Sequence, residues 1–224
     1  DWSSDVCSSD LEKYNMIDTH SHLFVEEFDE DLPAVIERAR DSGVSKVFMP
    51  NIDDTTVEAM LNVCTAYKGY CFPMIGFHPT SVGADSLFRI YEMKKLLSGE
   101  HPFVAVGEVG MDLYWDKTYL KEQQKALDIQ IQWALEYHLP LVLHCREAFP
   151  ELFEVMEPYK KTELSGIFHS FTGALEEAGQ VLEYARFFFG INGVVTFKKS
   201  SLAEVLPHIP LRSEERRVGK ECRS

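Results

Sequence analysis

Short apolar runs alternate with longer amphipathic stretches along almost the whole chain, and this alternation limits the fold more than any other feature. Seven apolar runs have the length of a buried strand, and a stretch with helical apolar spacing follows each of them. The predicted strands cover residues 15–20, 44–52, 70–77, 102–110, 139–144, 164–171 and 186–193, and the predicted helices cover residues 32–43, 53–69, 86–99, 119–138, 149–159, 175–185 and 201–209. Strands that alternate with helices form a parallel sheet through right-handed crossovers, so we predict an α/β protein.

Seven strand–helix units favour a (β/α)8 TIM-type barrel over an open sheet. Such a barrel has eight units and typically about 250 residues. The chain has 224 residues, of which 45% are hydrophobic, so it can bury the core of one large domain. Because the repeat stops after residue 211, we predict that the eighth βα unit is missing from this chain.

Both ends of the chain differ in character from its middle. Residues 1–10 (DWSSDVCSSD) and residues 212–224 (RSEERRVGKECRS) can each be written as a codon string that resembles a sequencing-adaptor strand. We therefore expect an incomplete barrel domain at residues 12–211, between adaptor-like, non-native segments at residues 1–11 and 212–224. The alternative is that both segments are natural tails.

The charge of the chain is strongly acidic. The formal net charge is −14; the first eleven residues hold three acids and no base, and the last thirteen hold five bases and three acids, so residues 12–211 carry −13. This balance argues against a broad basic surface for nucleic acid. It does not exclude a metal site that handles phosphate, because bound cations can dominate the local charge.

The cysteines and the hydropathy pattern indicate a cytoplasmic protein. Cys64, Cys71 and Cys145 have no metal-ligand spacing, so we interpret them as free thiols in a reducing compartment. No apolar run reaches the length of a membrane helix, and no signal peptide is visible.

Polar residues gather where the predicted strands end, which is where the active site of a βα barrel lies. Five of the eight histidines fall at these ends, together with three carboxylates and an arginine: Asp18, His20, His22, His78, Glu108, Asp112, His144, Arg146 and His169.

The pattern of these residues predicts a metal site. His20 and His22 are two residues apart, so on a strand both imidazoles project to the same face. Glu108, His144 and His169 each end a different strand, and mixed imidazole and carboxylate ligands suit Zn, Mn, Fe or similar ions. Five ligands suit two ions with Glu108 as a bridge. The alternative is a set of polar rim residues that share no metal.

Five segments in order resemble the motifs of the TatD-type metal-dependent deoxyribonucleases, within the amidohydrolase-like metallohydrolases. They are MIDTHSHL, GFHP, VGEVGMDLY, PLVLHCREA and FHSFTG, and the resemblance runs from about residue 16 to residue 211. It implies a (β/α)8 barrel that hydrolyses phosphodiester bonds with two divalent metal ions, Mg, Mn or Zn. The implied substrate is DNA, single-stranded or at a 3′ end, and neither a membrane nor an obligate protein partner is implied.

The resemblance also implies a role for each site residue. His20, His22 and Glu108 would hold one ion, and Glu108, His144 and His169 the other. His78 and Arg146 would contact the substrate phosphate, although a salt bridge at the rim is an equal alternative for Arg146. A family motif of the type LLxETDxP, whose Asp activates water, is absent. We therefore expect a 3′-5′ exodeoxyribonuclease in the full-length form and an inactive chain here.

Two other functions remain open at this point. One is an amidohydrolase that acts on a C–N or ester bond of a small molecule. Such enzymes often carry HxH after the first strand and a Lys on the fourth strand, where this chain has Glu108. The other is a metal-binding protein without catalytic activity.

Overall fold

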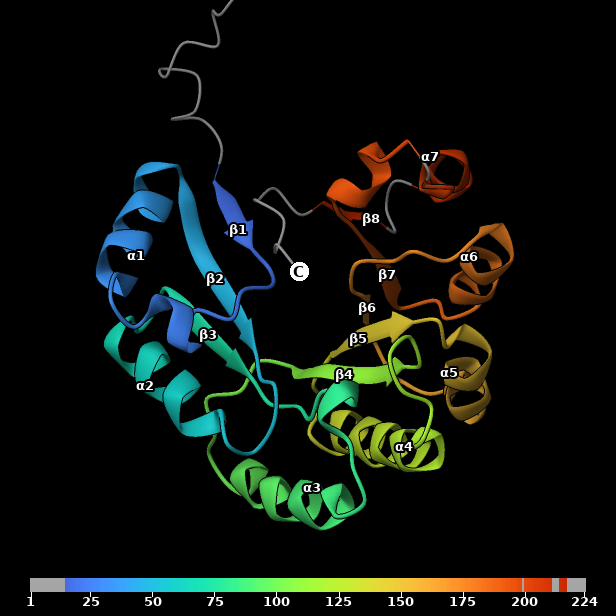
Figure 1. Cartoon of the computed structure of the whole chain (residues 1–224), viewed down its shortest axis with the longest axis horizontal. Coiled ribbons are helices and arrows are strands. Elements are labelled where there is room, and N and C mark those ends of the chain that lie inside the picture. The colour runs from blue at the N-terminus through green and yellow to red at the C-terminus, as the bar shows by residue number, and fades with distance from the viewer. Residues whose placement is uncertain (1–14, 199, 211–213, 217–224) are drawn as a thin grey trace, which may run out of the picture.

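The structure, a computed structural model, describes residues 15–198, 200–210 and 214–216, and it confirms the predicted alternation of strands and helices (Figure 1). The strands are β1 Met16–Asp18, β2 Val44–Pro50, β3 Cys71–Met74, β4 Val106–Asp112, β5 Leu141–Arg146, β6 Gly166–Phe168, β7 Phe187–Ile191 and β8 Glu214–Arg216. The helices are α1 Leu32–Asp41, α2 Val57–Ala66, α3 Ser86–Lys94, α4 Leu120–Glu136, α5 Phe149–Met156, α6 Leu175–Leu182 and α7 Leu202–Val205.

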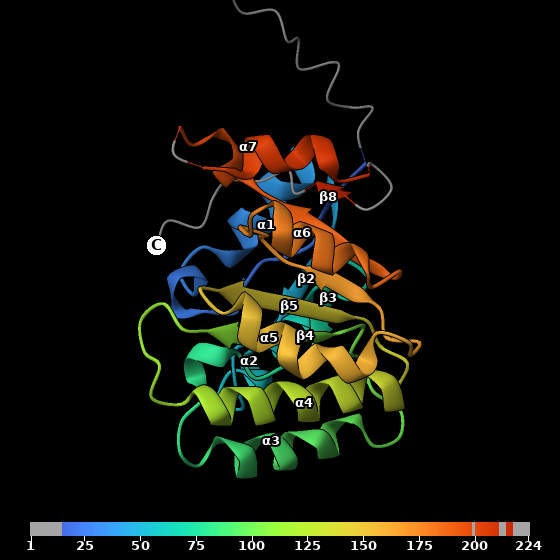
Figure 2. The same cartoon turned by 90° about the vertical axis from the view of Figure 1, so that its right-hand side faces the viewer.

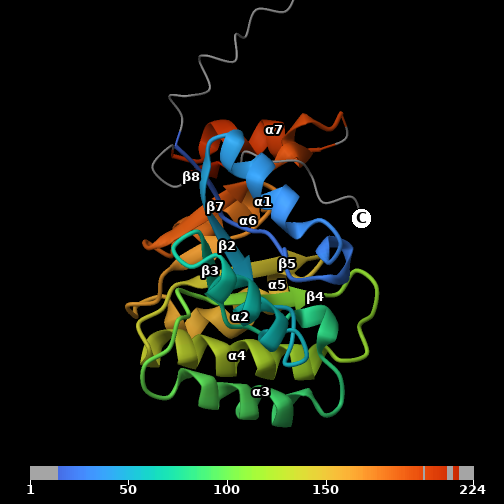
Figure 3. The ribbon, with the colours of Figure 1, turned by 90° about the vertical axis from the view of Figure 1, so that its left-hand side faces the viewer.

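All strand pairs are parallel, and they form two arcs in chain order. The first arc is β1-β2-β3 and the second is β4-β5-β6-β7-β8; a bridge between Ile75 and Val106 links them. The strands surround the centre, and the helices lie outside them (Figure 1). Figure 2 shows α4, α5 and α6 outside the second arc, and Figure 3 shows α1 and α2 outside the first. This arrangement is the predicted (β/α)8 barrel architecture.

The predicted absence of the eighth unit needs a correction for its strand. Three residues of the segment that we expected to be non-native form β8, which pairs with β7 from Phe189 to Ile191. The edge of β7 presents unpaired N–H and C=O groups, and any extended backbone can satisfy them. Within the described part of the chain, no helix follows β8 and no ladder joins it to β1. Residues 1–11, and residues 212–224 apart from β8, lie outside the described residues.

Amphipathic helices pack one face on the strands to form the core. The longest helix, α4, buries Leu127, Ile131 and Trp133 on one side, as its apolar spacing predicts. The same inner face carries two buried polar residues, Gln123 and Gln130, which reach the site described below. None of the described helices is long and apolar enough to cross a membrane.

Candidate metal centre

A buried carboxylate lies at the centre of the site. Glu108, in β4, is only 4% exposed, and its two oxygens face different histidines. Oε2 lies 3.0 Å from His20 Nε2 and 3.7 Å from His22 Nε2. Oε1 lies 3.1 Å from His144 Nδ1 and 3.8 Å from His78 Nε2. The carboxylate therefore separates two pairs of imidazoles. We call these five residues and His169 the metal centre.

The ionisation of Glu108 suits a metal ligand. Burial by itself would raise the pKa of this carboxyl group, but the surrounding imidazoles, His20 foremost, outweigh burial and hold the pKa well below its usual range. The group is therefore a carboxylate at neutral pH. An ionised carboxylate between imidazole nitrogens is a donor set that fits Zn, Mn and related divalent ions.

His20 and His22 meet Glu108 from a loop and not from a strand, which corrects one expectation. β1 ends at Asp18, and both histidines follow it. The backbone N–H of His20 donates to Asp18 Oδ1 at 3.0 Å, which holds the start of this loop. His22 Nδ1 lies 3.0 Å from the carbonyl oxygen of Pro50. A carbonyl only accepts, so Nδ1 carries the proton and the lone pair of Nε2 faces Glu108.

The structure groups His169 with His20 and not with His144. The two rings stack with centroids 3.6 Å apart and planes 11° apart. Two sets of ligand atoms lie within 4.8 Å of one another: His20, Glu108 and His169 in one set, and His78, Glu108 and His144 in the other. This grouping differs from the one implied by the family resemblance, because inward side chains of a barrel also meet side chains from strands that are not their neighbours.

His144 makes contact with two carboxylates. Its Nδ1 faces Glu108, and its Nε2 lies 2.8 Å from Asp112 Oδ2. Burial alone would lower the pKa of His144, but the hydrogen bonds to Asp112 and Glu108 outweigh it and raise the pKa to about 9. A histidine ligand commonly donates its second N–H to a carboxylate that orients the ring. Asp112 is in position to do this for His144.

Asp112 is the residue whose role the sequence analysis missed. It was recognised only as a polar residue at a strand end, yet it is 5% exposed and adjoins the metal centre. The available signal was its spacing: Asp112 is four residues after Glu108, so both side chains project from the same face of β4.

His78 differs from the other histidines in its hydrogen bonds. Its Nδ1 accepts a hydrogen bond from the backbone N–H of Thr80 at 3.2 Å and lies 2.7 Å from the Thr80 hydroxyl, which can donate to the same nitrogen; in this tautomer the proton of the neutral ring is on Nε2. Burial, opposed by Glu108, lowers the pKa of His78 to about 4, so the ring is neutral. Its Nε2–H therefore points into the site as a donor.

Arg146 lies beside the metal centre, at the end of β5. Its guanidinium is 3.8 Å from the centroid of the Tyr114 ring and 5.8 Å from that of Trp115. It takes part in none of the ion pairs found among the described residues. A rim salt bridge of Arg146 is therefore not found among the described residues, and the residue is exposed.

A glycine permits the close approach of the two strands that carry Glu108 and His144. Gly110 has a φ of 142°, and a Cβ atom built on it would lie 1.9 Å from the carbonyl oxygen of His144. Any side chain here would push β4 and β5 apart. Gly110 therefore sets the distance between β4 and β5 at the metal centre.

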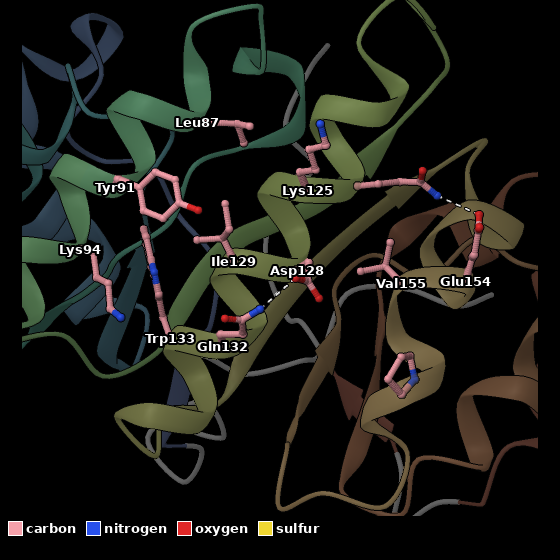
Figure 4. A pocket seen from close by; sticks show the side chains of 12 residues that line it. Leu87, Tyr91, Lys94, Lys125, Asp128, Ile129, Gln132, Trp133, Glu154 and Val155 are labelled. Carbon is pink, nitrogen blue, oxygen red and sulfur yellow. Dashed lines mark hydrogen bonds between the residues drawn. The ribbon is translucent and has the colours of Figure 1, made fainter.

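A separate groove of about 570 Å³ lies on the outer surface among α3, α4 and α5 (Figure 4). Tyr91, Lys94, Asp128 and Glu154 are among its lining residues, and no residue of the metal centre is. The chemistry of the metal centre therefore does not involve this groove.

Comparisons with known proteins find metal-dependent hydrolases that are similar to this chain in sequence and in fold. A family model described as TatD related DNase matches residues 17–213. The uncharacterized metal-dependent hydrolase YabD of Bacillus subtilis is 32% identical over 87% of this chain and 76% of its own length. The 3′-5′ ssDNA/RNA exonuclease TatD of Pantoea sp. is 31% identical over 87% of this chain and 75% of its own length. The crystal structure of YjjV, a TatD homolog from Escherichia coli, superposes with a TM-score of 0.77 at 27% identity, covering 89% of this chain and 77% of that one.

Proposed function

Because the chain belongs to the TatD related DNase family of metal-dependent hydrolases, we propose that its site hydrolyses phosphodiester bonds at the 3′ end of single-stranded DNA with two divalent ions. Relatives named as 3′-5′ ssDNA/RNA exonucleases support the substrate. We also propose a cytoplasmic location.

The observation that carries this proposal is the division of the histidines by Glu108. One ion would lie on the Oε2 side with His20 and His22, and one on the Oε1 side with His144. His169 lies nearer to His20 in the structure, and its assignment to the second ion stays a prediction. A pair of divalent ions stabilises both the attacking and the leaving oxygen of a phosphoryl displacement.

Of the other residues of the site, His78 and Arg146 would bind the substrate, and Asp112 would orient His144. The Nε2–H of His78 and the guanidinium of Arg146 are donors that suit a phosphodiester, since neither is engaged by a carboxylate hydrogen bond or ion pair shorter than 3.8 Å among the described residues. Asp112 holds His144 so that Nδ1 faces Glu108.

Hydrolysis of a C–N or ester bond of a small molecule is the competing activity. The TatD family assignment and the carboxylate at position 108 favour the phosphodiester. The expectation that a water-activating Asp is missing from this chain stays a prediction.

The test measures metal content and nucleotide release together. Elemental analysis of the chain loaded with Mg, Mn or Zn should give about two ions, and Glu108→Ala should lower the content for both. For activity, the chain is compared with a version that continues after Leu211 with an eighth βα unit containing LLxETDxP. We expect the extended version to release nucleotide 5′-monophosphates from single-stranded DNA.

The matched control is Glu136→Ala, which removes an exposed carboxylate at the end of α4 that pairs with Lys94. It should change neither the metal content nor the release of nucleotides. Unchanged metal content in Glu108→Ala would refute the bridging role. Hydrolysis of acylated amines without release of nucleotides would favour the competing activity.

A further inference from the structure

We infer that Trp115, supported by Tyr114 and Arg146, is a stacking surface for an unpaired base of the substrate next to the metal centre. We call these three residues the stacking platform. The inference rests on the proposed function, and it adds the residue that would recognise the base and the reason why a single strand would be preferred.

The stacking platform is joined to the metal centre by short connections. The backbone N–H of Tyr114 donates to Asp112 Oδ1 at 3.0 Å, and Asp112 also contacts His144. The backbone N–H of Leu113 donates to the carbonyl oxygen of Arg146 at 3.0 Å. The segment after β4 is therefore fixed to the end of β5, two residues beyond His144, which is about 7 Å along an extended strand. A nucleotide bound at the metal centre would therefore lie beside the stacking platform.

The side chains of the stacking platform support one another. The rings of Tyr114 and Trp115 meet edge to face, with centroids 4.6 Å apart and an angle of 86°. The guanidinium of Arg146 covers the Tyr114 ring at 3.8 Å, a distance typical of a cation–π contact. These contacts hold Arg146 near the site, and no ion pair found among the described residues includes it. The platform thus combines a ring surface with an anion donor.

Trp115 is open to a ligand. It is 77% exposed, more than any other large hydrophobic residue in the described part of the chain, and Tyr114 is 49% exposed. At this exposure at least one face of the indole is uncovered. Amphipathic aromatic rings at the edge of a cleft commonly bind the faces of flat ligands, and proteins that bind single strands use them to stack bases.

The charge of the molecule makes stacking the more effective way to hold a strand. The chain carries −14, so contacts between Lys or Arg and phosphates cannot supply broad affinity for DNA. Stacking of a base on an aromatic ring depends little on charge or on sequence, because every base has a π face. It does require that the base has left its duplex neighbours. A single-stranded end fulfils this condition, and the middle of a duplex does not.

The experiment measures binding apart from hydrolysis. A fluorescein-labelled, phosphorothioate-linked dT10 strand, which resists cleavage, is titrated with the protein in Mg²⁺, and its anisotropy is recorded. We expect Trp115→Ala to raise the Kd by about 5- to 150-fold, the range for loss of one stacked base. Trp115→Phe keeps a ring and should stay within about threefold of the wild type. The matched control is Phe88→Ala, which removes a 70% exposed ring from α3 and should leave the Kd unchanged.

A second measurement uses a double-stranded ligand. The same strand annealed to its complement should bind more weakly, and Trp115→Ala should not change this binding. Circular dichroism and the Tm show whether each variant is folded. Equal Kd values for Trp115→Ala and Phe88→Ala would overturn the stacking role, even if the extended version releases nucleotides. Absence of nucleotide release by the version extended with an eighth βα unit, with the Trp115→Ala loss intact, would refute the proposed hydrolysis and retain the stacking surface.

Discussion

At the scale of single residues, the partner on the second ring nitrogen decides what each histidine can do. The carbonyl oxygen of Pro50 accepts a hydrogen bond from Nδ1–H of His22, which leaves the lone pair of Nε2 facing Glu108. The backbone N–H of Thr80 donates to Nδ1 of His78, which leaves Nε2 as a hydrogen-bond donor that faces the site. Asp112 accepts from Nε2 of His144, which directs Nδ1 at Glu108. Three histidines therefore have three different partners, and the partner sets which ring nitrogen carries the proton.

The first prediction concerns Asp112→Asn. The neutral amide orients His144 less strongly and lowers the basicity of its imidazole, so metal affinity should fall about 10- to 100-fold, the usual cost of losing such a partner. Titration calorimetry with Mn²⁺ measures the change. Asp116→Asn, an exposed carboxylate in the following loop, is the control and should bind Mn²⁺ like the wild type. An unchanged affinity in Asp112→Asn would show that Asp112 does not act through His144.

The second prediction concerns two buried thiols. Burial raises the pKa of Cys64 to about 12 and that of Cys71 to about 11, so both stay protonated far above neutral pH. The thiolate is the reactive form, so at pH 8 both should react with iodoacetamide at least about 100-fold more slowly in the folded chain than in urea. Peptide mapping by mass spectrometry measures each site. The rate should rise with pH, and fast labelling at pH 8 would contradict the burial of these thiols.

At the scale of elements, helix α4 positions the strand ends that carry the site. Gln123 and Gln130 are seven residues apart and share its inner face. Gln123 accepts from the backbone N–H of Asp112 and donates to its carbonyl, both at 2.9 Å. Gln130 does the same for Phe77, at 2.7 and 3.3 Å, directly before His78. The helix thus supplies hydrogen bonds where the β-ladder ends, and it fixes both Asp112 and His78.

The third prediction concerns Gln130→Met, which preserves volume and removes the amide. The backbone N–H and C=O of Phe77 would lose their partner in a buried place, so the free energy of unfolding should fall by about 2–4 kcal/mol. Urea denaturation measures this change. Gln132→Met, on the exposed face of α4, removes surface hydrogen bonds with Asp128 and Tyr159 and should stay within about 0.5 kcal/mol of the wild type. If the free energy of unfolding fell as little in Gln130→Met as in the control, water would have replaced the amide as the partner of Phe77.

At the scale of the whole molecule, the metal centre joins the two arcs of the sheet. His20 and His22 follow β1 of the first arc, whereas Glu108, His144 and His169 belong to the second. Between the arcs, the backbone is joined by the bridge of Ile75 with Val106, by hydrogen bonds of Asn51 with Gly107 and Glu108, and by one from Val104 to Pro73. A ligand held by both arcs binds the folded chain and not the unfolded one, so it stabilises the fold by mass action.

The fourth prediction follows from this arrangement. A divalent ion at about 100 times its Kd should stabilise the fold by about 2.7 kcal/mol, which for a chain of this size raises the Tm by about 5–11 °C. Thermal unfolding followed by circular dichroism measures the shift, and EDTA should reverse it. Glu108→Ala should show no comparable shift. If the Tm of the wild type did not change when metal was added, the metal would not join the two arcs.

The sequence by itself determined the order of the elements and the membership of the site. Apolar periodicity is a local property, so it predicted all seven strand–helix units, from β1 to α7. In a parallel barrel the ends of the strands meet at one face, so the positions of His20, His78, Glu108 and His144 could be predicted to lie together.

Only the tertiary structure decided which of these residues contact one another. The stacking of His169 on His20, the support of His144 by Asp112 and the pairing of β8 with β7 join residues from separate elements. Hydrogen bonds and ring contacts depend on distances of a few tenths of an ångström across the barrel interior. Spacing along the chain sets which face a residue occupies, and packing of the elements against one another sets those distances.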